Sequence, residues 1–335
     1  MMIRMNILKA IVIACIFLNG CVHHKPTVGM QTSEKSPNSR NQKVMSINVE
    51  RGVNVEVIDF GGVGPDLILL SGLGDTAHRF SHFAEKLTKT FHVYGITRRG
   101  FGTSSSPDPS PENYGSDRLG NDVLAVIDAL HLDKPIVAGH SIAGSELSSI
   151  GTRHAEKVAG LVYLDALGPA AFYDVENPDT WMELIETKRS IERLLQLLQQ
   201  GGPDVLPTGI ALQKELRSLD KMLTSDIAFW KKIPKDIVQA DAARPPLNPI
   251  YIALLNGRQK YTTIKGPVLA VCAIPVEIDE IHREIRKNQL RKFSAFEKAN
   301  PHAKVVRIEN ADHYIYESNE AEVVHEINLF ANQLK

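Results

Sequence analysis

The sequence contains few cysteines, and neither sign of charge is in excess. Three cysteines in 335 residues are too few for a disulfide-stapled fold or a four-cysteine zinc site. Lys and Arg total 38 and Asp and Glu total 39, a net charge of −1, which argues against the basic footprint of a nucleic-acid-binding protein. Hydrophobic residues make up 43% of the chain, so we expect a folded protein rather than a disordered one.

The sequence also has no apolar run long enough to cross a bilayer comfortably. The run 10–18 has the length of a signal-peptide core, and it ends in LNGC at 18–21, which resembles a bacterial lipobox. Residues 1–20 are therefore expected to be a lipoprotein-type signal peptide, with Cys21 as the lipidation site. The resemblance implies a membrane partner reached through an N-terminal lipid anchor, in the cell envelope on its periplasmic or extracellular face. Secretion without an anchor is the alternative.

Residues 21–43 contain mostly polar residues and predict a flexible tether. Strand and helix patterns alternate beyond it, which predicts an α/β protein with a mainly parallel sheet and helices on both faces. Alternating apolar residues predict a hairpin over 45–57. Further strands are expected at 67–70, 91–96, 135–138, 161–164, 268–272 and 305–308, and helices near 77–87, 119–130, 181–198, 210–230 and 323–334.

Residues 169–264 interrupt this alternation. Their pattern is helical, and no buried parallel strand is recognisable among them. We interpret this segment as a helical cap, a lid over the functional site. The α/β core is then formed by residues 44–168 and 265–335.

A serine follows one predicted strand in the motif GHSIAG at 139–144. A serine at a sharp strand-to-helix turn has a strained backbone and needs small neighbours, which Gly139 and Ala143 provide. The turn exposes the Ser141 hydroxyl and directs the Ile142 N–H, at the start of a helix, toward developing negative charge.

A glycine-rich loop, Gly72–Ala77, follows another predicted strand and has two interpretations. Beside a nucleophile, it supplies a second oxyanion donor, the Leu73 N–H. As G-x-G-x-x-A, it matches a dinucleotide fingerprint, in which Arg98 and Arg99 could bind the 2′-phosphate of NADP. The hairpin that precedes the loop disfavours this second interpretation, because the fingerprint normally opens its domain.

A histidine, His313, follows the last predicted strand in the sequence ADHY. From that loop it can reach Ser141 and act as its general base. No metal is expected, because His78 and His82 have the i, i+4 spacing of a zinc pair but lack the adjacent glutamate and a third ligand.

Together these motifs resemble the α/β-hydrolase family over about 44–335. The matching segments are SGLG at 71–74, RRGFGTS at 98–104, GHSIAG at 139–144 and DH at 312–313. The resemblance implies an eight-stranded, mostly parallel sheet flanked by helices, with a cap insertion. It also implies a serine hydrolase that needs no cofactor. Members that open epoxides or remove halogens resemble this chain but carry an aspartate nucleophile.

The acid that would orient His313 has two candidates. Similar hydrolases place it after the penultimate strand, where Glu277 is near but shifted, or after the strand before it, where Asp165 stands. Asp165 is preferred. The expected reaction is hydrolysis of a carboxylic ester or related acyl bond in a small-molecule substrate, through an acyl-enzyme intermediate. An NADP-binding oxidoreductase and a non-catalytic envelope lipoprotein that retains the fold are the alternatives.

Overall fold

We obtained a computed structural model of the chain, which describes residues 42–231, 248–277 and 280–334. The predicted signal peptide, almost all of the tether and Cys21 lie outside these residues, as does part of the predicted cap. The described residues form two compact units: residues 42–174 with 248–334, and residues 175–231.

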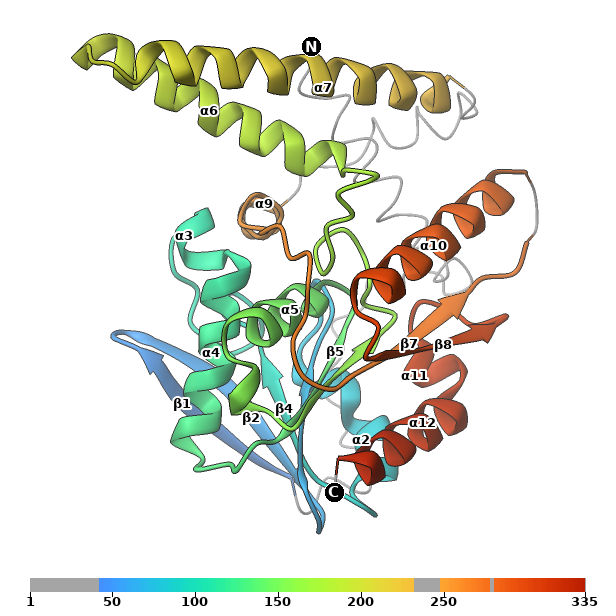
Figure 1. Cartoon of the computed structure of the whole chain (residues 1–335). Coiled ribbons are helices and arrows are strands. Elements are labelled where there is room, and N and C mark those ends of the chain that lie inside the picture. The colour runs from blue at the N-terminus through green and yellow to red at the C-terminus, as the bar shows by residue number, and fades with distance from the viewer. Residues whose placement is uncertain (1–41, 232–247, 278–279, 335) are drawn as a thin grey trace, which may run out of the picture. The chain divides into compact units, whose positions relative to one another are not determined.

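An eight-stranded sheet forms the centre of the larger unit (Figure 1). The first two strands are antiparallel to their neighbours and the remaining strands are parallel, which confirms the predicted fold class. The spatial order is β1 (Lys43–Glu50), β2 (Val53–Gly61), β4 (His92–Thr97), β3 (Asp66–Leu70), β5 (Ile136–His140), β6 (Gly160–Leu164), β7 (Val268–Ile274) and β8 (Ala303–Glu309).

The central strands are short and almost wholly apolar because helices cover both faces of the sheet. Every residue of β5, β6 and β7 is buried, and such strands lack the alternation of a half-exposed strand. On one face lie α4 (Ser116–Ala129), α5 (Gly144–Arg153) and α10 (Glu280–Ala299). On the other lie α2 (Ser81–Leu87), α11 (Ile315–Ser318) and α12 (Glu320–Gln333).

Two further short helices belong to the larger unit, α3 (Pro111–Tyr114) and α9 (Pro249–Asn256). Neither α9 nor α10 was predicted from the sequence pattern. Helix α9 has a recognisable start, since the Asn248 side chain accepts the Ile250 N–H at 2.9 Å and Pro249 occupies the first turn.

The smaller unit is a pair of packed helices, α6 (Thr180–Gln200) and α7 (Val205–Trp230). Asp179 begins α6 by accepting the Met182 N–H at 3.1 Å, and Gly201 ends it with a φ of 70°, a left-handed conformation that favours glycine. The bounds and lid role of the cap remain predictions. Within the part of the chain that the structure describes, no helix has both the length and the apolar character needed to span a bilayer.

Candidate active site

The turn that carries Ser141 has the predicted strand–turn–helix form. Strand β5 ends at His140, Ser141 has a φ of 57°, and α5 begins three residues later. The backbone is crowded on both sides of the serine. A Cβ on Gly139 would lie 3.0 Å from the Ala143 Cβ, and one on Gly144 would lie 2.1 Å from the Ala166 carbonyl oxygen. Small residues are therefore required at these positions, and the strained serine is held at the carboxyl edge of the sheet.

Three side chains from separate loops form a continuous hydrogen-bonded chain at this edge. His313 Nε2 lies 2.9 Å from Ser141 Oγ, and His313 Nδ1 lies 2.7 Å from Asp165 Oδ2. The histidine and aspartate side chains are only 12% and 5% exposed. Because the carboxylate accepts a hydrogen bond from Nδ1–H, Nε2 is left as the acceptor for the serine hydroxyl.

Asp165 follows β6 and is fixed by β7 beside it. Its N–H donates to the Val271 carbonyl at 2.8 Å, and its Oδ1 accepts the Ala273 N–H at 3.0 Å. Its φ of 44° turns the chain so that the second carboxylate oxygen meets the imidazole. The structure gives the alternative acid, Glu277, a different partner, since it accepts from Arg283 Nε at 2.5 Å.

The glycine-rich loop lies against the turn that carries Ser141. A Cβ on Gly72 would be 3.4 Å from the Ser141 Cβ and 2.8 Å from His140 Nδ1. The loop closes as a turn in which the Asp75 N–H donates to the Gly72 carbonyl at 3.4 Å, and the Ser71 hydroxyl donates to the Asp75 carbonyl at 3.1 Å. The loop therefore holds the backbone of Leu73, which follows Gly72, near Ser141. The backbone N–H of Ile142, the residue after Ser141, lies on the adjoining turn.

His140 supports the loop that carries His313, a contact that no sequence motif indicated. Its Nε2–H donates to the His313 carbonyl at 2.9 Å, and the two imidazole rings pack with centroids 4.6 Å apart. Burial, and secondarily the proximity of His313, lower the pKa of His140 well below its ordinary value, so the ring is neutral. The loop that carries His313 also contacts the glycine-rich loop, because the Tyr314 hydroxyl donates to Asp75 Oδ2 at 3.1 Å.

The two arginines considered for a 2′-phosphate are both buried in ion pairs. Arg98 pairs with Glu146, and Arg99 forms two hydrogen bonds of 2.6 Å with Asp122. Neither guanidinium is presented to a ligand, which argues against the dinucleotide interpretation of the loop.

The histidine pair on α2 and the turn before it is also separated. His78 lies 3.5 Å from Glu56, whereas His82 lies 3.4 Å from Glu320. Among the described residues, no group of three histidine, cysteine or acidic side chains is arranged to hold a metal.

Comparison with known proteins identifies the family. A sequence profile of the alpha/beta hydrolase family matches residues 67–326. N-formylmaleamate deformylase of Pseudomonas putida is 33% identical over 115 residues, which make up 34% of this chain and 42% of that protein. The AB hydrolase superfamily protein YisY of Bacillus subtilis is 34% identical over 126 residues, 37% of this chain and 46% of that protein.

A solved structure described as E-2-(acetamidomethylene)succinate hydrolase superimposes with a TM-score of 0.54 at 16% identity, covering 87% of this chain and 99% of the other. At that identity the likeness concerns the fold alone. The chain spans less than half the length of the two curated relatives.

Proposed function

Because the chain belongs to the alpha/beta hydrolase family, we propose that it is a serine hydrolase that cleaves a carboxylic ester or a related acyl bond. The observation that carries the proposal is the unbroken hydrogen-bonded chain from Ser141 through His313 to Asp165. In this arrangement the serine has its base, and the base has the acid that holds its tautomer.

The reaction proceeds in two halves. His313 Nε2 takes the Ser141 proton as the serine oxygen attacks the substrate carbonyl carbon, and the Leu73 and Ile142 N–H groups stabilise the resulting oxyanion. The imidazolium then protonates the leaving alcohol and an acyl-enzyme forms. Water gives a proton to His313 and attacks the acyl carbon. His313 then returns that proton to Ser141 Oγ as the acyl carbon–oxygen bond breaks, which releases the acid and restores the serine. Asp165 stays ionised throughout and stabilises the imidazolium.

Apolar side chains beside the glycine-rich loop favour an apolar group on the substrate. Leu73, Phe101 and Ile250 are partly buried and pack on one small cluster. The Tyr251 ring stacks on Phe101 with centroids 5.9 Å apart, and its hydroxyl reaches to within 2.7 Å of where a Cβ on Gly74 would be. We therefore expect uncharged esters with an apolar acyl or alcohol group to be better substrates than charged ones.

A second candidate reaction is hydrolysis of an amide or formamide. It is favoured by the similarity to a protein named as a deformylase. The same serine, base and oxyanion donors serve both reactions, and only the leaving group differs.

The test is labelling of the full chain with a fluorophosphonate, read by intact mass, with Ser141→Ala as the control. One adduct on the wild-type protein and none on the control is the expected result. A panel of uncharged esters, charged esters, lactones and formamides then identifies the bond that is cleaved. A folded wild-type protein without an adduct would instead favour the non-catalytic alternative.

We also propose that the chain is anchored in the cell envelope by a lipid on Cys21. The support is the short apolar run before the LNGC motif at 18–21. In a bacterial host, Cys21→Ala should move the protein from the membrane fraction to the soluble fraction and abolish labelling by a radioactive fatty acid. Continued membrane association of this variant would contradict the lipid anchor.

A further inference from the structure

A buried ion pair lies between the two backbone segments that carry the proposed oxyanion donors. Arg98 directly follows β4, and Glu146 lies on α5, the helix that begins after Ser141. Arg98 Nε donates to Glu146 Oε1, and both side chains are only 4% exposed. Burial raises the pKa of the Glu146 carboxyl, although the charge of Arg98 opposes this shift.

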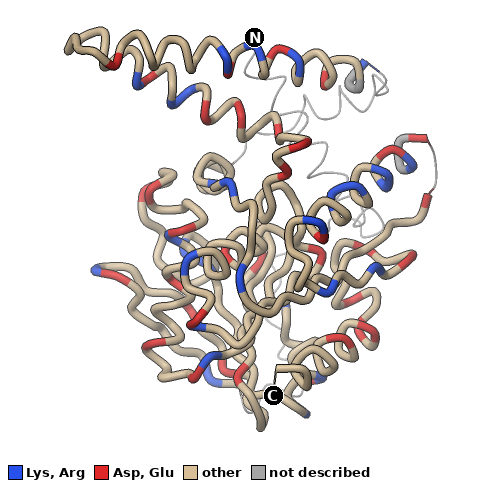
Figure 2. Tube along the Cα trace, viewed as in Figure 1, with Lys and Arg blue, Asp and Glu red and all other residues tan. Residues whose placement is uncertain are grey.

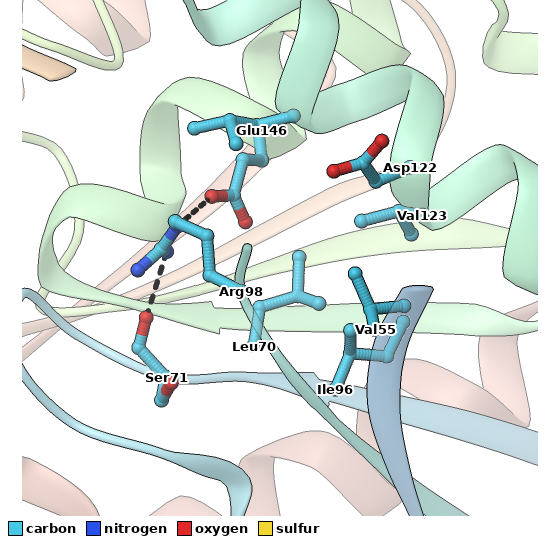
Figure 3. Close-up of a pocket in the computed structure, with 9 residues that line it drawn as sticks. Val55, Leu70, Ser71, Ile96, Arg98, Asp122, Val123 and Glu146 are labelled. Carbon is cyan, nitrogen blue, oxygen red and sulfur yellow. Dashed lines mark hydrogen bonds and ion pairs between the residues drawn. The ribbon is translucent and has the colours of Figure 1, made fainter. Parts of the chain in front are cut away.

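The remaining N–H groups of Arg98 bind the glycine-rich loop. Nη2 donates to the Ser71 carbonyl at 2.9 Å, and Nη1 donates to the Gly72 carbonyl at 3.3 Å. Figure 3 shows Arg98 extended between Glu146 and Ser71, beside a small cavity lined by apolar side chains that include Leu70. One guanidinium therefore connects the loop to the nucleophile helix.

The contact with the Gly72 carbonyl has a direct consequence for Leu73. The Gly72 C=O and the Leu73 N–H belong to one planar trans peptide, and in such a peptide they point in opposite directions. A donor that fixes the carbonyl on one side therefore fixes the direction of the N–H on the other. A cation bound to the carbonyl oxygen also polarises the peptide and makes its N–H a stronger donor.

We propose that Arg98 and Glu146 are positioning residues that set the orientation of the Gly72–Leu73 peptide, and with it the strength of the Leu73 oxyanion donor. This inference rests on the proposed function of Ser141 as the nucleophile. Glu146 fixes Arg98 relative to the helix that begins just after the Ile142 N–H, so the positions of the two donors are fixed relative to each other. These donors bind the substrate's ground state only weakly, whereas they stabilise the oxyanion of the transition state directly.

The neighbouring residue Arg99 provides a matched control. Its side chain is fully buried and it binds Asp122, Glu50 and the Asn113 carbonyl. These partners lie on α4, β1 and α3 rather than on the glycine-rich loop. Arg98→Lys and Arg99→Lys thus make the same chemical change in two adjacent buried ion pairs, and only the first alters the support of the Gly72 carbonyl.

The experiment compares the wild-type full chain with these two variants. Fluorophosphonate labelling first establishes the active serine. Then kcat and KM are measured with p-nitrophenyl butyrate, the inhibition constant with an alkyl trifluoromethyl ketone that forms a tetrahedral adduct, and Tm by circular dichroism. For Arg98→Lys we expect kcat to fall by about 10-fold or more, given ~10²- to 10³-fold for loss of a whole oxyanion donor. The KM should stay nearly constant, and affinity for the ketone should fall in parallel with kcat. Arg99→Lys should lower Tm but retain kcat.

Equal losses of kcat in the two variants would overturn the inference, as would a ketone affinity that Arg98→Lys leaves unchanged. If Arg98→Lys does not fold, Glu146→Gln is used, because it keeps the size and an acceptor but leaves the guanidinium charge unbalanced. The inference then requires a lower kcat at unchanged KM, and an unchanged kcat would overturn it. A folded wild-type chain that neither labels nor turns over would refute the proposed function and this inference together, whereas a labelled wild type with equal variants would refute the inference alone.

Discussion

Replacing Asp165 with asparagine should invert the hydrogen bonding of His313 without disturbing the fold. Asp165 Oδ1 accepts the Ala273 N–H at 3.0 Å, so the amide oxygen of the variant must take that place. The amide NH₂ then faces His313 Nδ1, which Asp165 Oδ2 contacts at 2.7 Å in the wild type. Nδ1 is forced to accept, the proton moves to Nε2, and Nε2 can no longer accept the Ser141 proton.

The magnitude follows from the loss of the correct tautomer. In a serine triad this loss lowers kcat by about 10⁴, which corresponds to ~5 kcal/mol of transition-state stabilisation. The variant keeps the side-chain volume and the hydrogen bond to Ala273, so the free energy of unfolding should change by no more than about 1 kcal/mol. Steady-state ester hydrolysis measures the first quantity and urea unfolding measures the second.

The matched control is Glu277→Gln, which makes the same chemical change in the acid that pairs with Arg283. It should retain wild-type turnover. If Asp165→Asn stayed within about threefold of wild type while Glu277→Gln lost its activity, the reasoning would be refuted and the acid role would pass to Glu277.

Three further outcomes are expected. Gly144→Ala should lower the free energy of unfolding by about 3 kcal/mol, because its Cβ would lie 2.1 Å from a backbone oxygen, whereas Gly209→Ala, with open space around it, should raise it by ~0.5–1 kcal/mol; urea titrations would measure both. Because folding lowers the pKa of His140, the unfolded state binds more protons than the folded state below pH 6.5. The free energy of unfolding should therefore decrease as the pH is lowered below 6.5, by up to ~1.4 kcal/mol per pH unit. His140→Gln should remove this component of the stability–pH profile. Burial raises the pKa of Cys272 well above its ordinary value, so iodoacetamide should alkylate it only after unfolding, as peptide mapping would reveal.

The strands were predictable from the sequence because a strand buried on both faces appears there as a short run of consecutive apolar residues. Such runs stand at 67–70, 161–164 and 268–272. A run of this kind is either a strand covered on both faces or a short buried helix, and its short length together with its alternation with helical segments favours the strand. Helix α10 was not predicted because it contains many charged residues and few apolar ones. The apolar residues that face the sheet, among them Phe293 and Phe296, do share one side of the helix, but they are too few to stand out in the sequence.

Some residues of the candidate site were likewise predictable from local motifs, whereas others depend on contacts between distant segments. Ser141 and His313 stand in short motifs at strand ends, so they could be named from the sequence. The choice between Asp165 and Glu277 depends on how β6 pairs with β7, and that register is set by contacts between segments more than a hundred residues apart. The roles of Arg98 and His140 are equally hidden, since each acts on the backbone of a distant loop.

The chain order of the site has a consequence for the newly made protein. Ser141 and Asp165 emerge during synthesis long before His313, and the helices α6 and α7 lie between them in the sequence. Within the part of the chain that the structure describes, strand β8, which leads to His313, pairs only with β7, the strand that follows that insertion. A partly synthesised or truncated chain therefore holds Ser141 without the histidine that hydrogen-bonds to it. If the proposed function holds, the chain becomes competent to react only when its final strand docks, and premature fragments should not label with a fluorophosphonate.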